Sequence, residues 1–120
     1  MFPLSCDRQD VYLFCDPVDM RKSINGLSAL VDTCLDINPV SDNLFVFINR
    51  MRDKIKILQW SGNGFWLHYK VLEKDHFRRP LGEIDGEYIR LSRQQLNWLL
   101  DGLPIEQKAH QSLTTLYGII

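Results

Sequence analysis

Residues 44–73 hold the feature that most constrains the fold, which is three strand-like segments in close succession. The run LFVFI at 44–48 is apolar at every position, as is typical of a central strand that is buried on both faces. The segments KIKILQW at 54–60 and FWLHYKVLE at 65–73 follow, and the turn signals NRMRD and SGNG separate the three. This pattern predicts an antiparallel β-meander at the centre of the domain.

Two shorter strands are predicted outside the meander. VYLF at 11–14 and EYIRL at 87–91 are rich in β-branched and aromatic residues. A chain of 120 residues suits one hydrophobic core. We therefore predict a single α+β domain with an antiparallel sheet over residues 1–104, and residues 105–120 as a C-terminal tail or appended arm.

Two helices are predicted to flank this sheet. Apolar residues recur at helical spacing from Met20 to Cys34, and Asp16 with Pro17 resembles a helix start, so the first helix is expected near 17–35. The segment SRQQLNWLLDGLP predicts a second helix near 93–101. Ser92 is the expected N-cap, and Gln95, three residues later, completes a capping box. Gly102 and Pro104 end the helix.

We expect a cytoplasmic protein from the hydropathy and cysteine pattern of the chain. No apolar run approaches the length of a membrane span, and the N-terminus has no signal-peptide pattern. The cysteines are odd in number and widely spaced, which favours reduced thiols over disulfides or a metal site. They are Cys6, Cys15 and Cys34.

Positive charge is concentrated in the middle of the chain, although the whole chain carries only −1. Residues 50–79 hold eight Lys and Arg against three Asp and Glu, a net charge of +5. The flanks 1–49 and 80–120 are acidic, with net charges of −4 and −2. A local basic stretch of this kind is a candidate polyanion-binding surface.

The register of the second hairpin decides where these charges lie. With an even loop, Lys54 and Lys56 would lie in the apolar layer that is expected from Leu67, Tyr69 and Val71 of the returning strand, and burial penalises that mixture. We therefore predict an odd loop of three or five residues, or a bulge, at 61–65. The residues that this register gathers on one solvent-exposed face are Lys54, Lys56, Trp66, His68 and Lys70.

The nucleic-acid hypothesis assigns phosphate contacts to the basic residues and base stacking to the exposed aromatic side chain. The competing interpretation is an ordinary solvated sheet face, whose edge lysines discourage aggregation. The candidate nucleic-acid-binding residues are Arg21, Lys22, Arg50, Arg52, Lys54, Lys56, Trp66, Lys70, Arg78 and Arg79.

Residues for catalysis or metal binding form no recognisable constellation in the sequence. The three histidines share no metal-ligand spacing, and no phosphate loop, nucleophile elbow or dinucleotide fingerprint is present. Asp16 and Asp19 are explained by a helix cap, and Cys15 by a buried strand. We expect a non-enzymatic protein without a cofactor or metal.

Two longer patterns resemble a known family. DPVDMRKSINGLSALV matches P-x-D-M-R-K-x-x-x-G-L, and residues 44–77 match L-F-V-F-x-x-R-x-x-D-x-I-K-x-L-x-W, continued by x-x-x-G-x-x-L-x-x-K-x-L-E-x-x-x-F. Over roughly 10–104 the chain resembles the small accessory protein of IS66-family bacterial insertion sequences, labelled TnpB or Orf2-like. The segment FRRP departs from the pattern, because Arg79 stands where relatives often carry an aromatic residue.

The resemblance implies a non-catalytic accessory factor of transposition, encoded beside a transposase and a second small accessory protein. The leading expectation is contact with insertion-sequence-end DNA through the basic sheet face. The alternatives are an adaptor that binds the transposase or its small companion without touching DNA, and a regulatory RNA binder. The DNA-binding face depends on the predicted register. A structure that places Lys54 and Lys56 on the other face of the sheet from Lys70 would contradict it.

Overall fold

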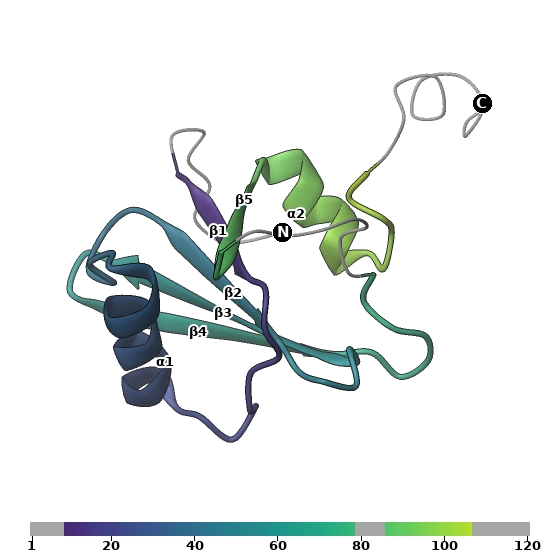
Figure 1. Cartoon of the computed structure of the whole chain (residues 1–120), viewed down its shortest axis with the longest axis horizontal. Coiled ribbons are helices and arrows are strands. Elements are labelled where there is room, and N and C mark those ends of the chain that lie inside the picture. The colour runs from purple at the N-terminus through teal and green to yellow at the C-terminus, as the bar shows by residue number, and fades with distance from the viewer. Residues whose placement is uncertain (1–8, 79–85, 107–120) are drawn as a thin grey trace.

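The computed structural model describes residues 9–78 and 86–106 of the chain. A π-helical turn, η1, directly continues the first helix. The elements in chain order are β1 (Val11–Phe14), α1 (Ile24–Leu30), η1 (Val31–Leu35), β2 (Leu44–Ile48), β3 (Lys54–Ser61), β4 (Gly64–Val71), β5 (Tyr88–Leu91) and α2 (Arg93–Leu100). The described residues form one domain with a five-stranded sheet and two helices. Figure 1 shows how these elements are arranged.

The sheet is mixed, in the order β4-β3-β2-β1-β5. The predicted antiparallel meander is present in β2, β3 and β4, and β5 is antiparallel to β1. The prediction of a purely antiparallel sheet is wrong, because β1 pairs with β2 in parallel. A parallel pair needs a crossover connection, and α1 with η1 supplies it between these two strands.

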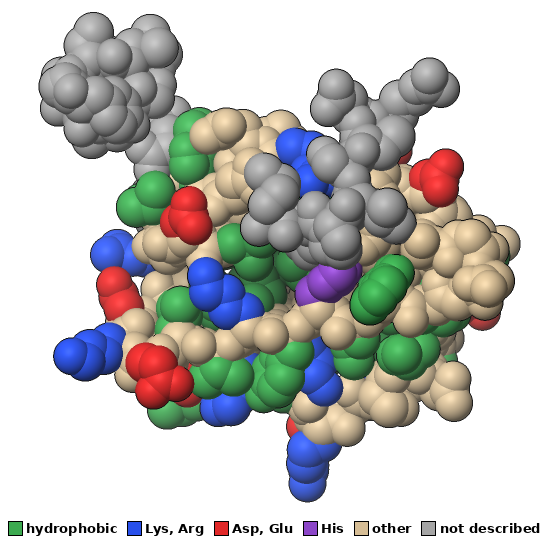
Figure 2. Space-filling model, turned by 180° about the vertical axis from the view of Figure 1, so that it is seen from behind, with side chains coloured by type: hydrophobic (Ala, Val, Ile, Leu, Met, Phe, Trp, Pro, Cys, Tyr) green, Lys and Arg blue, Asp and Glu red, His purple; other side chains and the backbone are tan. Residues whose placement is uncertain are grey.

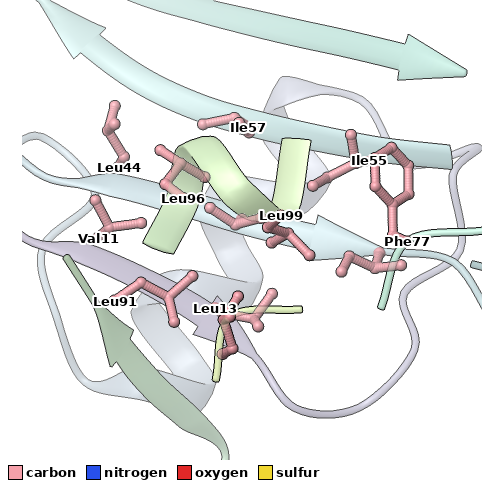
Figure 3. Packing of buried hydrophobic residues seen from close by; sticks show 12 residues of the cluster. Val11, Leu13, Leu44, Ile55, Ile57, Phe77, Leu91, Leu96 and Leu99 are labelled. Carbon is pink, nitrogen blue, oxygen red and sulfur yellow. The ribbon is translucent and has the colours of Figure 1, made fainter. Parts of the chain in front are cut away.

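Each face of the sheet has its own core, because side chains alternate along every strand. On one face Leu13, Leu44 and Ile57 pack with Leu96 and Leu99 of α2, which Figure 3 shows from close by. We call this the α2 face. On the other face, the α1 face, strand residues pack against α1 and η1; they include Tyr12, Phe14, Phe45, Phe47 and Leu58 against Leu27, Val31 and Leu35.

The first helix begins later than predicted. Its N-cap is Ser23, and the expected cap at Asp16 is wrong. The segment before it is drawn to the sheet, since the Val18 N–H donates to the Ile48 carbonyl at 2.9 Å. Asp19 accepts from the Arg21 N–H at 2.9 Å, in a local turn. These contacts explain why the motif does not start a helix at residue 17.

The second helix agrees with the sequence prediction. Ser92 and Gln95 form the predicted capping box, with Gln95 N–H donating to the Ser92 hydroxyl at 3.0 Å. At the other end Gly102 has a φ of 78°, and the Leu103 N–H donates to the Trp98 carbonyl at 2.8 Å. This is the Schellman arrangement that commonly ends a helix at glycine.

The second hairpin has the register that the sequence analysis rejected. Trp60 pairs with Phe65 and Ser61 with Gly64, so the loop contains two residues. Gly62 has a φ of 63°, the left-handed conformation that two-residue hairpin turns require. The predicted odd loop or bulge at 61–65 is therefore wrong, and every side chain of β4 points to the face opposite the expected one.

One residue of the predicted C-terminal tail packs into the core of the domain. Ile105, placed in the tail by the sequence analysis, is buried in the α2-face core at 5% exposure. Its carbonyl also accepts a long hydrogen bond from the Gln95 side chain at 3.5 Å. Residues 107–120 lie outside the described residues.

Candidate functional site

The predicted basic sheet face does not exist, because the hairpin register divides its residues between the two faces. Lys54 and Lys56 lie on the α1 face, whereas Trp66, His68 and Lys70 lie on the α2 face. Figure 2 shows one side of the molecule, where separate blue side chains are interspersed with red ones. Lys54 and Lys56 therefore lie on the opposite face from Lys70, and this arrangement contradicts the predicted DNA-binding sheet face.

Two lysines of the basic stretch bind main-chain carbonyls instead of facing solvent freely. The Lys56 ammonium donates to the carbonyls of Met20 and Lys22, at 2.7 Å and 3.0 Å, and so ties the segment before α1 to β3. The Lys70 ammonium donates to the Leu100 carbonyl at 2.7 Å, at the C-terminal end of α2. A cation is favourable there because the last helical carbonyls are unpaired and carry partial negative charge.

The other predicted residues lie mainly in the turn between β2 and β3 and in the segment before α1. Arg50 is exposed at the tip of the turn, and Arg52 is half-buried within it. Arg21 and Lys22 are exposed just before α1. Arg78 is exposed in the segment after β4, and Arg79 lies outside the described residues.

The turn between β2 and β3 is held by one asparagine side chain. The Asn49 carbonyl oxygen Oδ1 accepts from the backbone N–H groups of Asp53 and Lys54, at 3.1 Å and 3.0 Å. Its Nδ2 donates to the Asp53 carboxylate at 2.7 Å, and that hydrogen bond is the main cause of the lowered pKa of Asp53. Arg50 and its neighbour Met51 are therefore presented from a fixed turn.

This turn and the segment before α1 enclose a pocket of about 520 Å³, which we call the end pocket. The two sides come from stretches about 30 residues apart in the sequence, and both stretches belong to the family-like patterns. The residues that define it are Pro17, Asp19, Met20 and Arg21 on one side and Arg50, Met51 and Lys54 on the other. The fold thus brings together three of the predicted basic residues, although not on a sheet face.

The end pocket carries more positive than negative charge. Arg21 is neutralised by Asp19, because its guanidinium meets that carboxylate at 2.7 Å and 3.1 Å. Lys54 has a looser ion pair with Asp53, at 3.5 Å. Among the described residues Arg50 has no ion pair. One guanidinium is therefore available to an incoming anion, beside the exposed thioether side chain of Met51.

The Asp19–Arg21 pair should be visible in a titration. The hydrogen bonds from Arg21 lower the pKa of Asp19 to about 2 from an ordinary 3.8. The ionised form is favoured in the folded chain, so the pairing is intact above pH 3.8 and is lost as the pH falls through about 2. We expect carbon-detected NMR of the carboxyl group to give this value, and Arg21→Ala to raise it toward the ordinary one, since the guanidinium is lost while the backbone N–H of residue 21 still donates. Arg50→Ala is the matched control and should leave the Asp19 midpoint unchanged; a wild-type midpoint near 3.8 would contradict the pairing.

The described residues offer no metal centre, since they contain no group of three or more His, Cys, Asp or Glu side chains able to hold an ion. None of the helices in 9–78 and 86–106 is long and apolar enough to cross a membrane. The end pocket lacks a nucleophile paired with a base. Its arginines, lysine and methionines are suited to binding an anion next to an apolar group.

Sequence reasoning missed two features near the site. Met51 is 67% exposed in the turn, and its signal was an apolar residue inside an otherwise polar turn segment. Tyr69 and Val71 of β4 are also exposed, although the sequence analysis assigned them to the interior. Their exposure follows from the position of β4 at the edge of the sheet.

Comparison with known proteins connects this geometry to a family. A family model described as IS66 Orf2-like protein matches residues 9–110. The chain belongs to the IS66 Orf2-like family. This IS66 Orf2-like protein is 33% identical to protein y4jC of Sinorhizobium fredii over 87 residues, covering 72% of this chain and 73% of that one. It is 34% identical to y4hO of the same species over 93 residues, covering 78% and 79%. No solved structure matches it significantly.

Membership defines the general role of the IS66 Orf2-like protein. The family consists of accessory proteins of IS66 insertion sequences and is not a known catalytic family. The protein is accordingly a transposition-associated accessory protein. The match also extends six residues beyond Pro104, where the sequence analysis ended its resemblance.

Proposed function

We propose that this protein is a non-catalytic adaptor of IS66 transposition that binds the transposase or its small companion protein through the end pocket. The observation that carries the proposal is the convergence of both family-like stretches on this one pocket. The occupant that fits is an acidic segment of the partner that also contributes an apolar side chain. Such a segment would place a carboxylate on Arg50 and an apolar group against Met20 and Met51.

The pocket is suited to specific binding because its walls are fixed before a partner arrives. Asn49 holds the turn, and the Val18–Ile48 hydrogen bond holds the opposite wall against β2. The Lys56 ammonium adds two further contacts to the segment before α1. Preorganised groups lose little conformational entropy on binding, so a few contacts can give useful affinity.

Direct DNA binding is the second candidate, and the exposed cations around the end pocket favour it. Arg21, Lys22 and Arg50 are all exposed near one end of the sheet. Lys56 and Lys70 already bind carbonyls, so they contribute less to a phosphate-binding surface than the sequence analysis expected. Affinity for a nucleic-acid backbone depends on how many phosphates are neutralised, which makes this smaller cluster the weaker basis.

The deciding experiment compares Arg50→Glu with Arg78→Glu, which makes the same charge change at an exposed site outside the pocket. If the pocket binds an acidic segment, Arg50→Glu should weaken binding to the purified transposase or companion at least about tenfold, or 1.4 kcal/mol. Arg78→Glu should change it less than about twofold. Calorimetry at fixed ionic strength measures both. Equal loss in the two variants, or none in either, would contradict the adaptor proposal.

The same variants separate the DNA alternative. The wild-type chain is titrated with duplex DNA from the ends of the element at 50 mM and 200 mM salt, concentrations over which phosphate-dominated affinity falls by orders of magnitude. Tight DNA binding that collapses with salt and is lost in Arg50→Glu would replace the adaptor by a DNA-binding factor. Absence of such binding, together with Arg50-dependent partner binding, supports the adaptor.

A further inference from the structure

The outer edge of β4 is the longer of the two sheet edges in the described part of the chain. β4 is eight residues long and forms one end of the sheet order, and none of the described strands pairs with its outer side. Figure 1 shows it as the outermost arrow of the meander. The strand at the opposite end, β5, has only four residues. An exposed edge of this length is a template for pairing with another strand.

The register shows which backbone groups point outward. Ser61 and Gly64 close a two-residue loop, and such a closing pair is hydrogen-bonded. Hydrogen-bonded and non-hydrogen-bonded pairs then alternate along the antiparallel ladder. The N–H and C=O groups directed away from β3 therefore belong to Phe65, Leu67, Tyr69 and Val71.

Devices that normally block an edge strand are missing from β4. The strand GFWLHYKV contains no proline, and its eight consecutive pairs with β3 leave no bulge. Its one charged side chain, Lys70, is directed to the end of α2. Apolar side chains are exposed along the strand instead, with Trp66 and Tyr69 each 52% exposed.

We propose that the β4 edge pairs with the β4 edge of a second copy of this chain, antiparallel across a two-fold axis at His68. This register joins Phe65 to Val71 and Leu67 to Tyr69, so every outward backbone group on both copies finds a partner. A register centred on Leu67 would leave Val71 unpaired, and one centred on Tyr69 would leave Phe65 unpaired. The second copy is therefore the occupant that the strand itself specifies.

Side-chain chemistry across this junction is complementary. A two-fold axis perpendicular to the sheet keeps each face continuous, so the aromatic rings of Phe65 and Tyr69 would meet aliphatic side chains on the α1 face. On the α2 face Trp66 would lie opposite the stem of Lys70, a favourable aromatic–lysine pair. No two Lys, Arg, Asp or Glu side chains are placed opposite each other, and at the axis the His68 ring faces its own copy.

The test uses a variant that removes one outward N–H while keeping the ladder to β3. Tyr69→Pro does so, because proline is tolerated on an edge strand where its missing N–H faces away from the sheet. Tyr69→Thr is the matched control, which loses the ring but keeps the N–H and the β propensity. Sedimentation equilibrium of the full chain measures the mass, with circular dichroism confirming that each variant is folded.

We expect the wild-type chain and Tyr69→Thr to sediment at twice the 14.1 kDa chain mass, and Tyr69→Pro to dissociate at least about tenfold more readily. A wild-type chain that stays at 14.1 kDa up to millimolar concentration would overturn the proposal. So would a folded Tyr69→Pro variant that dimerises as well as Tyr69→Thr. Monomers that instead capture an extended apolar peptide would assign the edge to another protein and would likewise overturn it.

Cross-linking tests the register even if Tyr69→Pro fails to fold. At the axis His68 faces its own copy in a non-hydrogen-bonded pair, with Cα atoms roughly 4.5 Å apart, which is within disulfide range. His68→Cys should therefore form a disulfide-linked dimer under mild oxidation. Trp66→Cys should not, because its copy lies four residues away, roughly 13 Å along the strand. The wild-type chain gives the baseline for the native cysteines; equal cross-linking at both positions, or none at residue 68, would overturn the register.

Discussion

Replacing Phe77 with alanine is expected to lower the free energy of unfolding by about 3–5 kcal/mol, the usual cost of emptying a buried aromatic site. Phe77 lies in an irregular segment, yet its side chain is completely buried in the α2-face core. Figure 3 shows it beside Ile55. Its backbone N–H donates to the Arg52 carbonyl at 2.7 Å, so the segment after β4 is attached to the turn that bears the end pocket. Urea unfolding followed by tryptophan fluorescence measures the change.

Met51→Ala is the control for the Phe77 variant. Met51 is in the same turn region but is 67% exposed, so its removal should change stability by no more than about 0.5 kcal/mol. A Phe77→Ala loss below about 1 kcal/mol would show that Phe77 does not close this core. An equal loss in both variants would show that the turn, and not the buried ring, is the sensitive element.

Lys56→Met should lower the free energy of unfolding by about 1–2 kcal/mol. Methionine keeps most of the apolar stem but has no ammonium, so the carbonyls of Met20 and Lys22 lose a charged donor in the folded chain. Lys54→Met is the matched control on the same face. Its ion pair with Asp53 is long and partly solvated, so its loss should cost about 0–1 kcal/mol.

Urea midpoints of the two lysine variants are compared at one pH and ionic strength. Equal destabilisation by Lys54→Met and Lys56→Met would contradict the structural role of Lys56. If the role holds, reduced transposition in a Lys56 or Lys70 variant would report loosening of the segment before α1 or the end of α2. Such a result would not by itself identify a phosphate contact.

Local signals were sufficient for much of the fold. β3 and β4 follow LFVFI after short turns, so the three strands could be predicted as one meander. Ser92 and Gln95 form a cap within four residues, so the start of α2 could be predicted as well. The parallel pairing of β1 with β2 could not be predicted in this way. It depends on how the chain crosses from residue 14 to residue 44, and strand propensity contains no information on that path.

The hairpin register was mispredicted because the burial argument assumed that one face of β4 is fully buried in the core and that the other is fully exposed to solvent. β4 is an edge strand, and Tyr69 and Val71 remain exposed on the face that was expected to be interior. Lys56 does approach that interior, but two carbonyls satisfy its ammonium. The penalty that should have excluded the two-residue loop is therefore not incurred.

Several residues of the candidate site were predicted from the sequence, but their arrangement in a pocket was not. Arg21, Arg50 and Lys54 were singled out from charge and motif, and they do meet in the end pocket. Their meeting depends on the tertiary hydrogen bond between Val18 and Ile48, which joins segments 30 residues apart. Such contacts leave no periodicity in the sequence, so the pocket could be recognised only after folding was known.

The unequal lengths of the two sheet edges limit how far the chain could assemble. β4 offers eight residues, and symmetric pairing would consume that edge in both copies. The ends then exposed are the two β5 strands, each with four residues, so growth into a filament would lack a comparable template. The closed pair would carry one end pocket at each end of the same face, which would allow a single transposase assembly to be held bivalently, with avidity instead of new contacts.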